Sequence, residues 1–481
     1  MSATTLFESL AEELEERIHS GALSAGDRLP SVRQACLARG ISPSTVFQAY
    51  YLLEARGLIE ARPRSGYYVR KLRRARAAPL AAALQAPAPA AATEVVISEL
   101  IFDVLGSTRD AEVVPLGSAF AAAELFPLAQ LARCGARAMR QLPPRQLTAE
   151  LTSGNARLLQ ALRRRYGQHD IALAPQELVI CNGAMEALGL CLQAVTRPGD
   201  VVAVEGPTFY AALQALERLH LRAVEVPTDP RLGVDPDALA ELLARQPIAA
   251  CWFMPNFQNP LGALMPVARK KALVALLARH GVPLIEDDVY AELYHGIQRP
   301  RPAKAFDQEG GVLHCSSFSK CLAPGYRVGW AAAGRFAPQL QRLKMMSSLA
   351  TAVPSQLALA EYLEQGGYER HLRSLRQALA ASMARARALV LRHFPAGTRV
   401  SQPDGGYFLW LQLPAEVDTL ALHREALEAG ISTAPGQLFS ADRRFRQALR
   451  LNVGHPDDAR VEPAIAKLAQ MAAQIQRRAS P

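Results

Sequence analysis

The sequence predicts a multi-domain protein in which a small helical domain precedes a long α/β domain. Three observations carry this prediction. Helical spacing, capping residues and a hairpin signal fill residues 1–76. An Ala- and Pro-rich linker and connector follows at 77–113, and residues 114–475 then alternate short apolar runs with helical stretches. Uninterrupted apolar runs between helices are typical of a mostly parallel sheet that helices cover on both faces.

The composition sets wide bounds on function. The 481 residues have a formal net charge of +10, which permits a polyanionic partner, although a solvated basic surface is the simpler interpretation of charge alone. The start of the chain is acidic and lacks the apolar core of a signal peptide, and no apolar run is long enough to span a bilayer, so we expect a cytoplasmic protein. Seven scattered cysteines without metal-ligand or redox spacing predict reduced thiols and no metal site.

The first 76 residues predict three helices and a β-hairpin. Leucines and an isoleucine recur every four residues in the first helix. Ser31 caps the second helix, which Gly40 ends, and Ser42 caps the third. The expected elements are helices at 6–18, at 32–39 and from Pro43 up to Gly57, and strands at 58–62 and 67–70. This order of elements is the layout of a winged helix-turn-helix.

A winged helix-turn-helix places its third helix in the major groove of DNA. The candidates at the start of that helix and on the wing are Ser42, Ser44, Thr45, Gln48, Arg62 and Arg64. Arginines on the wing would neutralise phosphates and make the affinity depend on salt. From the layout alone, a three-helix module for dimerisation or docking remains the alternative.

Three segments of this region, LPSVR, STV and RPRSG, resemble the N-terminal DNA-binding domain of the GntR family of bacterial repressors. The resemblance covers nearly the whole region. It implies that DNA is contacted by Arg33, Ser42, Ser44, Thr45, Arg64 and Gly66. The sequence departs from the family at Pro43 and Phe47, where some members have arginines, and at Arg64, where a glycine is common. These departures should alter which operator is read more than whether DNA is bound.

Polar, Gly or Pro residues follow each apolar run of the large domain. The runs are 178–181, 201–204, 249–254, 282–285 and 312–315. Because ligands sit beyond the carboxyl ends of strands in such sheets, the side chains that follow the runs should converge at one edge. Alone, each candidate is weak: Lys320 is compatible with a surface lysine, Asp287 with a helix cap and Asn259 with a turn.

As an ordered set these residues suit the chemistry of pyridoxal phosphate (PLP). A lysine with a lowered amine pKa must form the Schiff base. An acid must keep the pyridine nitrogen protonated so that the ring withdraws electrons. A cation and the backbone donors of a helix start must hold the phosphate. Lys320, Asp287 and Arg327 are residues of the required types after strands of one sheet.

From about residue 115 to 472 the chain resembles the fold-type-I aminotransferases, closest to the branch with kynurenine and α-aminoadipate aminotransferases. The motifs are SSFSK, EDDVY, NPLG, EGPTFY and LRLNVG. The resemblance implies a large subdomain at about 150–340 and a small one at about 341–475. It implies catalytic roles for Lys320, which forms the Schiff base, for Asp287, which pairs with the pyridine nitrogen, and for Tyr290. The implied cofactor-binding residues are Ala184, Met185, Phe209, Asn259, Asp287, Tyr290, Ser317, Ser319, Lys320 and Arg327.

The resemblance also implies that Arg450 grips a substrate carboxylate with its two-pronged guanidinium. One departure concerns the phosphate loop. Ala184 and Met185 offer only backbone N–H groups where many relatives have a hydroxyl and an amide. We therefore expect either a lower PLP affinity or a greater dependence on Ser317, Ser319 and Arg327.

The chain joins a GntR-like DNA-binding domain at 1–76, called the reader below, to an aminotransferase-like body. Over its whole length it resembles the MocR type of transcriptional regulator. The resemblance implies a homodimer that binds double-stranded promoter DNA and senses PLP or a small amino compound through an aldimine at Lys320. Two alternatives stay open: a genuine aminotransferase with a vestigial or docking N-terminal domain, and a DNA-binding protein with an empty PLP fold. The effector, the operator and the direction of regulation are not encoded in any recognisable pattern.

Overall fold

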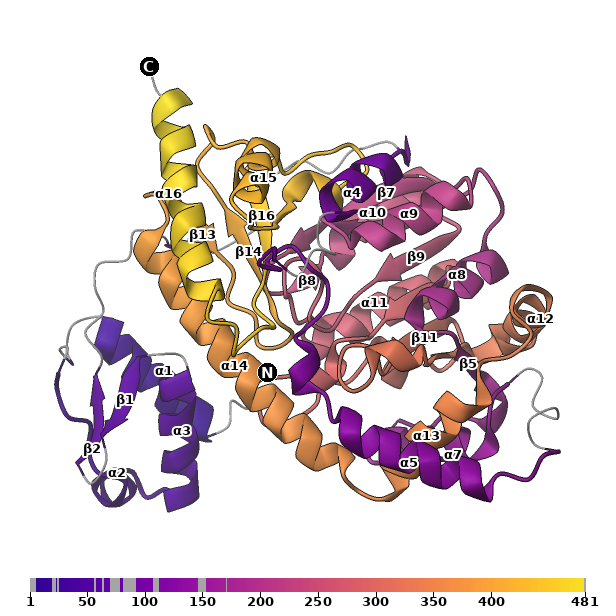
Figure 1. Ribbon diagram of the computed structural model, residues 1–481, viewed down its shortest axis with the longest axis horizontal. Coiled ribbons are helices and arrows are strands. Elements are labelled where there is room, and N and C mark those ends of the chain that lie inside the picture. The colour runs from indigo at the N-terminus through magenta and orange to yellow at the C-terminus, as the bar shows by residue number, and fades with distance from the viewer. Residues whose placement is uncertain are drawn as a thin grey trace.

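The computed structural model describes residues 6–19, 23, 26–55, 58–62, 65–69, 78–80, 92–106, 112–145, 153–169 and 171–479. Arg64 and the linker prolines Pro87 and Pro89 lie outside these described residues. The small N-terminal domain lies beside the large domain, where α3 contacts the long helix α14 (Tyr368–His393) (Figure 1).

The small domain has the predicted order of three helices and a hairpin. Its elements are α1 (Leu6–His19), α2 (Val32–Arg39), α3 (Pro43–Ala55), β1 (Ile59–Arg62) and β2 (Gly66–Val69). The Ser31 hydroxyl accepts a hydrogen bond from the Gln34 amide at 3.3 Å, and the Gln34 side chain accepts one from the Ser31 amide at 2.9 Å. This capping box starts α2, and Gly40 ends it with a φ of 64° that favours glycine.

The large domain is built on a nine-stranded sheet in the order β4-β7-β6-β9-β10-β11-β12-β5, with β8 beside β7. The strands are β4 (Thr93–Glu94), β5 (Leu178–Cys181), β6 (Val201–Gly206), β7 (Arg222–Asp229), β8 (Gly233–Val234), β9 (Ala250–Phe253), β10 (Leu284–Asp287), β11 (Val312–Ser317) and β12 (Gly329–Ala332). Strands β7, β6, β9, β10 and β11 are parallel, whereas β12, β5, β4 and β8 pair antiparallel with their neighbours. The predicted mostly parallel sheet is confirmed, and each predicted apolar run overlaps a strand.

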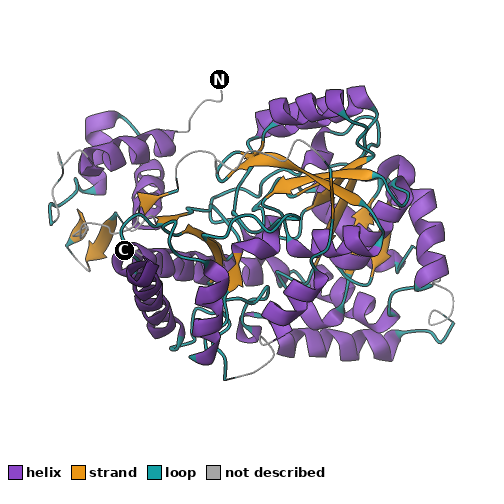
Figure 2. Ribbon diagram, turned by 90° about the horizontal axis from the view of Figure 1, so that it is seen from above, coloured by secondary structure: helices purple, strands orange, loops and turns teal. Residues whose placement is uncertain are grey.

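Helices cover both faces of this sheet (Figure 2). They are α4 (Ser98–Leu105), α5 (Leu128–Gln141), α7 (Ala156–Gly167), α8 (Ala184–Val195), α9 (Tyr210–Arg218), α10 (Pro236–Arg245), α11 (Val267–His280), α12 (Ala337–Ser347) and α13 (Val353–Glu364). Alternate residues of β6 show the two faces: Val202 and Val204 pack with α8 and α9, whereas Val201 and Ala203 pack with α10 and α11. This alternation is why the strand reads as an uninterrupted apolar run. Among the described helices, none has the length and apolarity needed to cross a lipid bilayer.

A second sheet of five strands, in the order β15-β16-β14-β13-β3, forms the core of the C-terminal part. Its strands are β3 (Ala78–Pro79), β13 (Arg399–Val400), β14 (Phe408–Gln412), β15 (Ala434–Pro435) and β16 (Ala448–Asn452), and its helices are α14, α15 (Thr419–Glu428) and α16 (Val461–Ala479). The edge strand β3 comes from the predicted linker and pairs parallel with β13. A short piece of the linker is therefore part of the large domain.

We expect Leu53→Ala to unfold the small domain while the large domain stays folded. Leu53 is fully buried in the core that α1, α3 and the hairpin share. Truncation of a buried leucine to alanine costs about 2–5 kcal/mol, and the whole stability of a small domain is on the order of 5 kcal/mol. Differential scanning calorimetry should lose one transition and keep the main one. Leu37→Ala, at a residue that is 78 % exposed, is the control and should keep both; loss of both transitions in Leu53→Ala would contradict the expectation.

Candidate functional site

Lys320 lies three residues beyond β11, where residues from the two sheets meet. Its Nζ donates a hydrogen bond to the Ala119 carbonyl oxygen at 2.7 Å and lies 4.0 Å from the centre of the Phe120 ring. Burial first, and then the charge of Arg450, lower the pKa of Lys320 while Asp287 raises it, and the net pKa is about 7. Near neutral pH much of this lysine is therefore an unprotonated amine, the form that acts as a nucleophile.

Asp287 is the last residue of the central strand β10 and is 1 % exposed. Burial raises the pKa of its carboxyl group to about 7; the Val289 backbone N–H opposes this rise and the neighbouring Asp288 adds to it. The Oδ1 atom of Asp287 has no hydrogen-bond partner among the described residues. Since buried carboxyl oxygens are almost always paired, this atom fits a site for an N–H donor that a ligand brings.

Tyr290 and Asn259 are two further buried polar groups of the site. The ring of Tyr290 packs edge-on against Tyr407 and Phe408, with centroids 5.7 and 5.6 Å apart. Burial raises the pKa of Tyr290 well above its ordinary value, so its phenol stays neutral. The Nδ2 atom of Asn259 is buried without a hydrogen-bond partner in the described part of the chain. Asn259 therefore holds a spare donor for an acceptor such as a phenolic oxygen.

An anion cradle lies at the start of α8, beside Arg327. Gly183 precedes the helix with a φ of 85° and supplies no side-chain cap. A Cβ at this position would lie 2.5 Å from a guanidinium nitrogen of Arg327. Arg327 also donates to the Ser319 hydroxyl at 3.4 Å, and the Ser317 hydroxyl accepts from the Ser319 amide at 3.3 Å. An uncapped helix start, a guanidinium and two hydroxyls are the donors that bind a phosphate.

The remaining predicted cofactor residues are Ala184, Met185 and Phe209. Ala184 and Met185 form the first turn of α8, and the Met185 side chain is 38 % exposed. Phe209 is half-buried at the start of α9, with its ring centre 4.9 Å from that of Tyr210. The structure thus offers an aromatic face and backbone donors at these three positions, and no side-chain hydrogen-bonding group.

Arg450 lies fully buried on β16 of the second sheet. Its Nη2 donates to the carbonyl oxygens of Gly117 at 2.6 Å and Ser118 at 2.9 Å, and its Nη1 donates to Asn259 Oδ1 at 3.2 Å. The guanidinium also lies 4.3 Å from the centre of the Phe408 ring. Its Nε has no partner in the described part of the molecule, which leaves one donor for an incoming oxygen atom.

The sequence did not reveal two contributors to the site. The first is the segment from Gly117 to Phe120, which meets Lys320 and Arg450 through backbone carbonyls. Carbonyl contacts leave no side-chain signature, so no pattern marks this segment. The second is Tyr407, whose hydroxyl donates to the Ala119 carbonyl oxygen at 3.0 Å. The Gly-Gly pair before Tyr407 predicts a tight turn and is the signal in the sequence that could have drawn attention to this residue.

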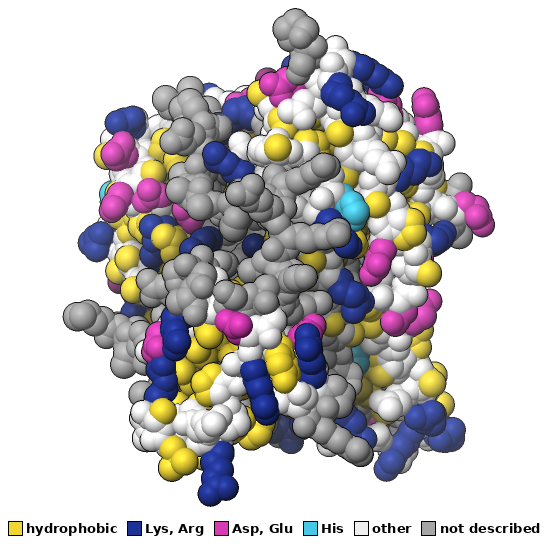
Figure 3. All heavy atoms as spheres, turned by 90° about the vertical axis from the view of Figure 1, so that its left-hand side faces the viewer, with side chains coloured by type: hydrophobic (Ala, Val, Ile, Leu, Met, Phe, Trp, Pro, Cys, Tyr) yellow, Lys and Arg dark blue, Asp and Glu magenta, His cyan; other side chains and the backbone are white. Residues whose placement is uncertain are grey.

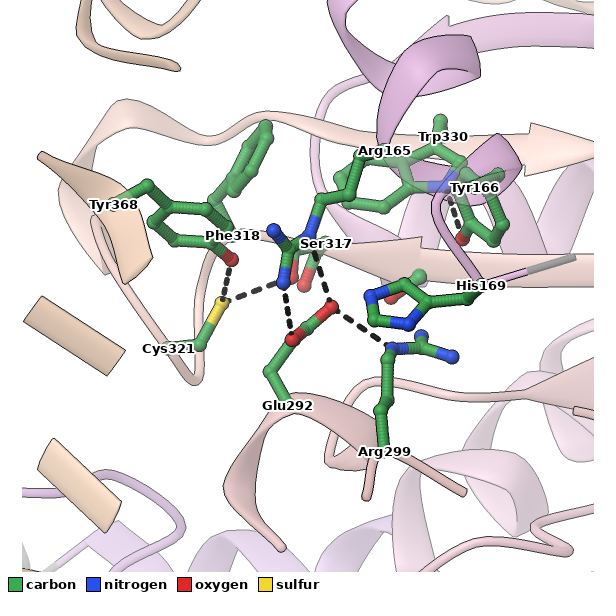
Figure 4. A pocket seen from close by; sticks show the side chains of 11 residues that line it. Arg165, Tyr166, His169, Glu292, Arg299, Ser317, Phe318, Cys321, Trp330 and Tyr368 are labelled. Atoms are coloured by element: carbon green, nitrogen blue, oxygen red, sulfur yellow. Dashed lines mark hydrogen bonds and ion pairs between the residues drawn. The ribbon is translucent and has the colours of Figure 1, made fainter. Parts of the chain in front are cut away.

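A buried ion-pair network lines a recess that Ser317 also borders (Figure 4). Glu292 accepts from Arg165 Nη2 at 2.6 Å and from Arg299 Nε at 3.0 Å, and Arg299 also pairs with Asp288 at 3.2 Å. Burial alone would raise the pKa of Glu292, but the two arginines hold it down at about 2. The charges in this recess are matched to each other, so we interpret the recess as structural.

Arg64 lies outside the described residues, and the other predicted DNA-contacting residues of the small domain are exposed or partly exposed. The hydroxyl of Ser42 caps α3 by accepting from the Thr45 amide at 3.2 Å, and it lies 2.8 Å from the Ser44 hydroxyl. Arg33 and Gln48 are exposed, and Gly66 has a φ of 109°. On the hairpin, Arg62 pairs with Glu60 at 2.8 Å and stacks 4.4 Å from the Tyr68 ring. Arg62 is therefore less available to a phosphate than an unpaired arginine.

Comparison with known proteins supplies two family matches. The family described as "Aminotransferase class I and II" matches residues 130–468, and "Bacterial regulatory proteins, gntR family" matches residues 6–69. The chain is 48 % identical to the uncharacterized HTH-type transcriptional regulator YdcR of Escherichia coli K12, over 97 % of this chain and 98 % of that protein. It is 36 % identical to the uncharacterized regulator YjiR of the same strain, over 94 % and 95 % of the two chains.

Solved structures match the large domain. The multiple substrate aminotransferase of Thermococcus profundus superposes with a TM-score of 0.74 at 26 % identity, over 80 % of this chain and 96 % of that one. The kynurenine aminotransferase of Pyrococcus horikoshii gives a TM-score of 0.74 at 28 % identity, over 79 % and 95 %. The chain therefore belongs to the aminotransferase class I and II family and, with its gntR-family domain, has the MocR-type architecture of transcriptional regulators.

Proposed function

We propose that this protein is a PLP-dependent transcriptional regulator that binds promoter DNA through its small domain and senses PLP or an amino compound at Lys320. The observation that carries the proposal is Asp287, whose Oδ1 has no hydrogen-bond partner among the described residues and whose charge influences the lowered pKa of the Lys320 amine, in a chain that also has a gntR-family domain. A buried acid and a nucleophilic lysine at one sheet edge suit PLP better than they suit a surface ion pair.

The donors and acceptors of the site fit PLP group by group. Asp287 would face the ring nitrogen, Asn259 and Tyr290 the phenolic oxygen, and Phe209 the ring face. The phosphate would lie at the start of α8, held by the backbone of Ala184 and Met185 and by Ser317, Ser319 and Arg327. When bound, PLP supplies a carbonyl carbon that reacts reversibly with amines, on a ring that withdraws electrons while its nitrogen is protonated.

The protein's own residues give this site its selectivity. Lys320 presents a neutral amine near pH 7, because burial lowers its pKa. Asp287 can hold a proton, or accept one, within the same pH range. Arg450 presents its spare Nε toward an anion in a buried setting, where a charged hydrogen bond is strong. We therefore propose an effector that carries an amine and a carboxylate.

Besides the contact between α3 and α14, the chain itself connects the reader to the second sheet. Strand β3 begins nine residues after β2 ends, and the Leu80 amide that follows it donates to the Val400 carbonyl oxygen at 2.8 Å. Leu80 is itself buried. The order β3-β13-β14-β16 leads from the linker to the strand that carries Arg450. We propose that a ligand held by Arg450 biases the reader through this sheet.

We also propose that the protein is a homodimer. The end of α12 and the turn after it expose Met345, Met346 and Leu349, at 52 %, 79 % and 59 %. Clustered exposed apolar side chains of this kind mark association surfaces. A two-fold dimer would present two reader domains to the two halves of an operator.

We expect PLP to be captured on Lys320 at a rate that rises through about pH 7. Only the unprotonated amine reacts, and burial lowers the pKa of Lys320 to about 7. Borohydride reduction followed by peptide mapping should find the adduct on the peptide that contains Lys320. The initial rate, measured from about pH 6 to pH 9, should level off more than two pH units below the range of an ordinary lysine, roughly 10.4.

Two variants test the cause of this profile. Arg450→Gln removes a positive charge that lowers the pKa of Lys320. The midpoint of the pH dependence of the capture rate should therefore move to higher pH in this variant. Lys467→Ala, on α16, should behave as the unaltered protein does. An adduct on another lysine, or a midpoint near pH 10, would contradict the assignment.

We expect PLP, alone or with an amino acid, to change the affinity for promoter DNA by roughly 5- to 150-fold, the usual range of coupling between two sites. Fluorescence anisotropy on a duplex selected from the protein's own genome measures this change. Lys320→Ala should bind the same duplex without responding. Specific DNA binding that never responds to PLP or amines would refute the sensing proposal, and fast transamination without specific DNA binding would favour an enzyme.

The variant Leu80→Asp tests the route through the second sheet. A carboxylate in place of a buried leucine should detach β3 from β13. The variant should still bind DNA and still capture PLP, but the change in DNA affinity that PLP causes should become smaller. Val96→Asp makes the same change at a residue that is 59 % exposed and should leave the response intact.

The dimer proposal predicts that Met346→Glu weakens self-association. A charge in an apolar contact loses its hydration without gaining a partner. Analytical ultracentrifugation should show dimers for the unaltered protein and a dissociation constant at least about 10-fold higher for the variant, equivalent to about 1.4 kcal/mol. Ile297→Glu, at another residue that is 59 % exposed, is the control. Equal dissociation constants for all three proteins would place the interface elsewhere.

A further inference from the structure

One face of α3 is exposed and partly aromatic. Phe47 is 53 % exposed and Tyr51 is 60 % exposed, and Ser44 and Gln48 are exposed beside them. The spacing 44, 47, 48, 51 places these four side chains on one stripe of the helix. The opposite stripe is buried in the core of the small domain and consists of Val46, Ala49, Tyr50 and Leu53.

The packing of the small domain does not account for this aromatic stripe. Among the described residues, the hydrophobic core of the domain and the side chains packed against it do not include Phe47 or Tyr51. The stripe also continues directly from the hydroxyls of Ser42 and Ser44, which lie 2.8 Å apart at the start of the helix. Hydroxyl, amide and apolar groups on one helical stripe are the groups that contact base edges.

The surroundings of the stripe favour duplex DNA over a protein as its occupant. From Val32 to Leu53 the sequence contains Arg33 and Arg39 and no aspartate or glutamate; Arg39 pairs with Glu13 of α1, which leaves Arg33 as the cation of this segment without such an ion pair among the described residues. Figure 3 shows Lys and Arg side chains among exposed apolar side chains on the lower part of the side of the molecule on which the small domain lies. A helical stripe without acidic side chains does not repel the negatively charged phosphates that border the major groove.

We propose that Phe47 is a specificity-determining residue that contacts the C5-methyl group of a thymine in the operator. This inference rests on the proposed function, because it requires that α3 enters the major groove. Thymine is the base that presents an apolar group there, and a phenyl ring is apolar and without hydrogen-bonding atoms. Some GntR-family members have an arginine at this position, which would instead donate hydrogen bonds to the acceptor atoms of guanine.

The test replaces thymine by uracil, which differs only by the methyl group. Operators are first selected from a random duplex pool by the full-length protein. Each thymine of the selected operator is then replaced by uracil, one position at a time. For the unaltered protein, one or two positions should each show a loss of affinity of roughly 3- to 5-fold, as expected for the loss of one buried methyl group.

The same series with Phe47→Ala identifies the residue that makes the contact. At those positions the variant should bind thymine and uracil duplexes equally, and Phe47→Arg should select guanine there. Leu37→Ala, at an exposed apolar residue of α2, should keep the penalty for uracil. The salt dependence of binding should stay the same in Phe47→Ala and Leu37→Ala, because neither substitution changes the charge of the protein.

The outcomes separate this inference from the proposal beneath it. If the protein selects an operator but no uracil weakens binding, or if Phe47→Ala keeps the same penalty, the role of Phe47 is refuted and DNA binding stands. If no operator is selected, the proposed function fails and the inference fails with it.

Discussion

The buried guanidinium of Arg450 is the interaction on which both halves of the site depend. It joins β16 of the second sheet to the carbonyl groups of Gly117 and Ser118 and to the side chain of Asn259, which follows β9 of the first sheet. The oxygens that it contacts in the described part of the chain are neutral, and burial lowers the pKa of Arg450. Taking a charge out of water without a counter-charge costs several kcal/mol, so the surrounding packing must hold this cation in place.

The same constraint bears on the effector that we propose for the site. A carboxylate that reaches Arg450 offsets the desolvation of the guanidinium, which a neutral ligand cannot do. The positive charge of Arg450 also lowers the pKa of Lys320, so an anion beside it would raise that pKa again. Charge at Arg450 and reactivity at Lys320 are therefore linked, although the two residues lie on different sheets. This linkage is a physical reason for a site that distinguishes an amino acid from a simple amine.

The sequence predicted the features that depend on local chemistry and on strand direction. Ser31, Gly40 and Ser42 delimit helices through caps that involve only neighbouring residues. Lys320 and Asp287 were expected at one edge because parallel strands end there together, and Asp287 does influence the pKa of Lys320. The carbonyls of the segment 117–120 could not be predicted, because every residue has a carbonyl. The pairing of β3 with β13 could not be predicted either. Ala78–Pro79 has no alternating strand pattern, and its pairing depends on Arg399–Val400, which is far away in the sequence.

The weakness of this edge pairing suits it to carry a signal. A net hydrogen bond contributes about 0.5–1.5 kcal/mol, so the few bonds of β3 and Leu80 to β13, apart from the burial of the Leu80 side chain, amount to a stabilisation of the same order as a typical coupling of about 1–3 kcal/mol. A ligand that shifts the second sheet by differential binding could therefore release or restore this strand. A much stronger attachment would not respond to one small molecule, and a much weaker one would not transmit its binding to the reader.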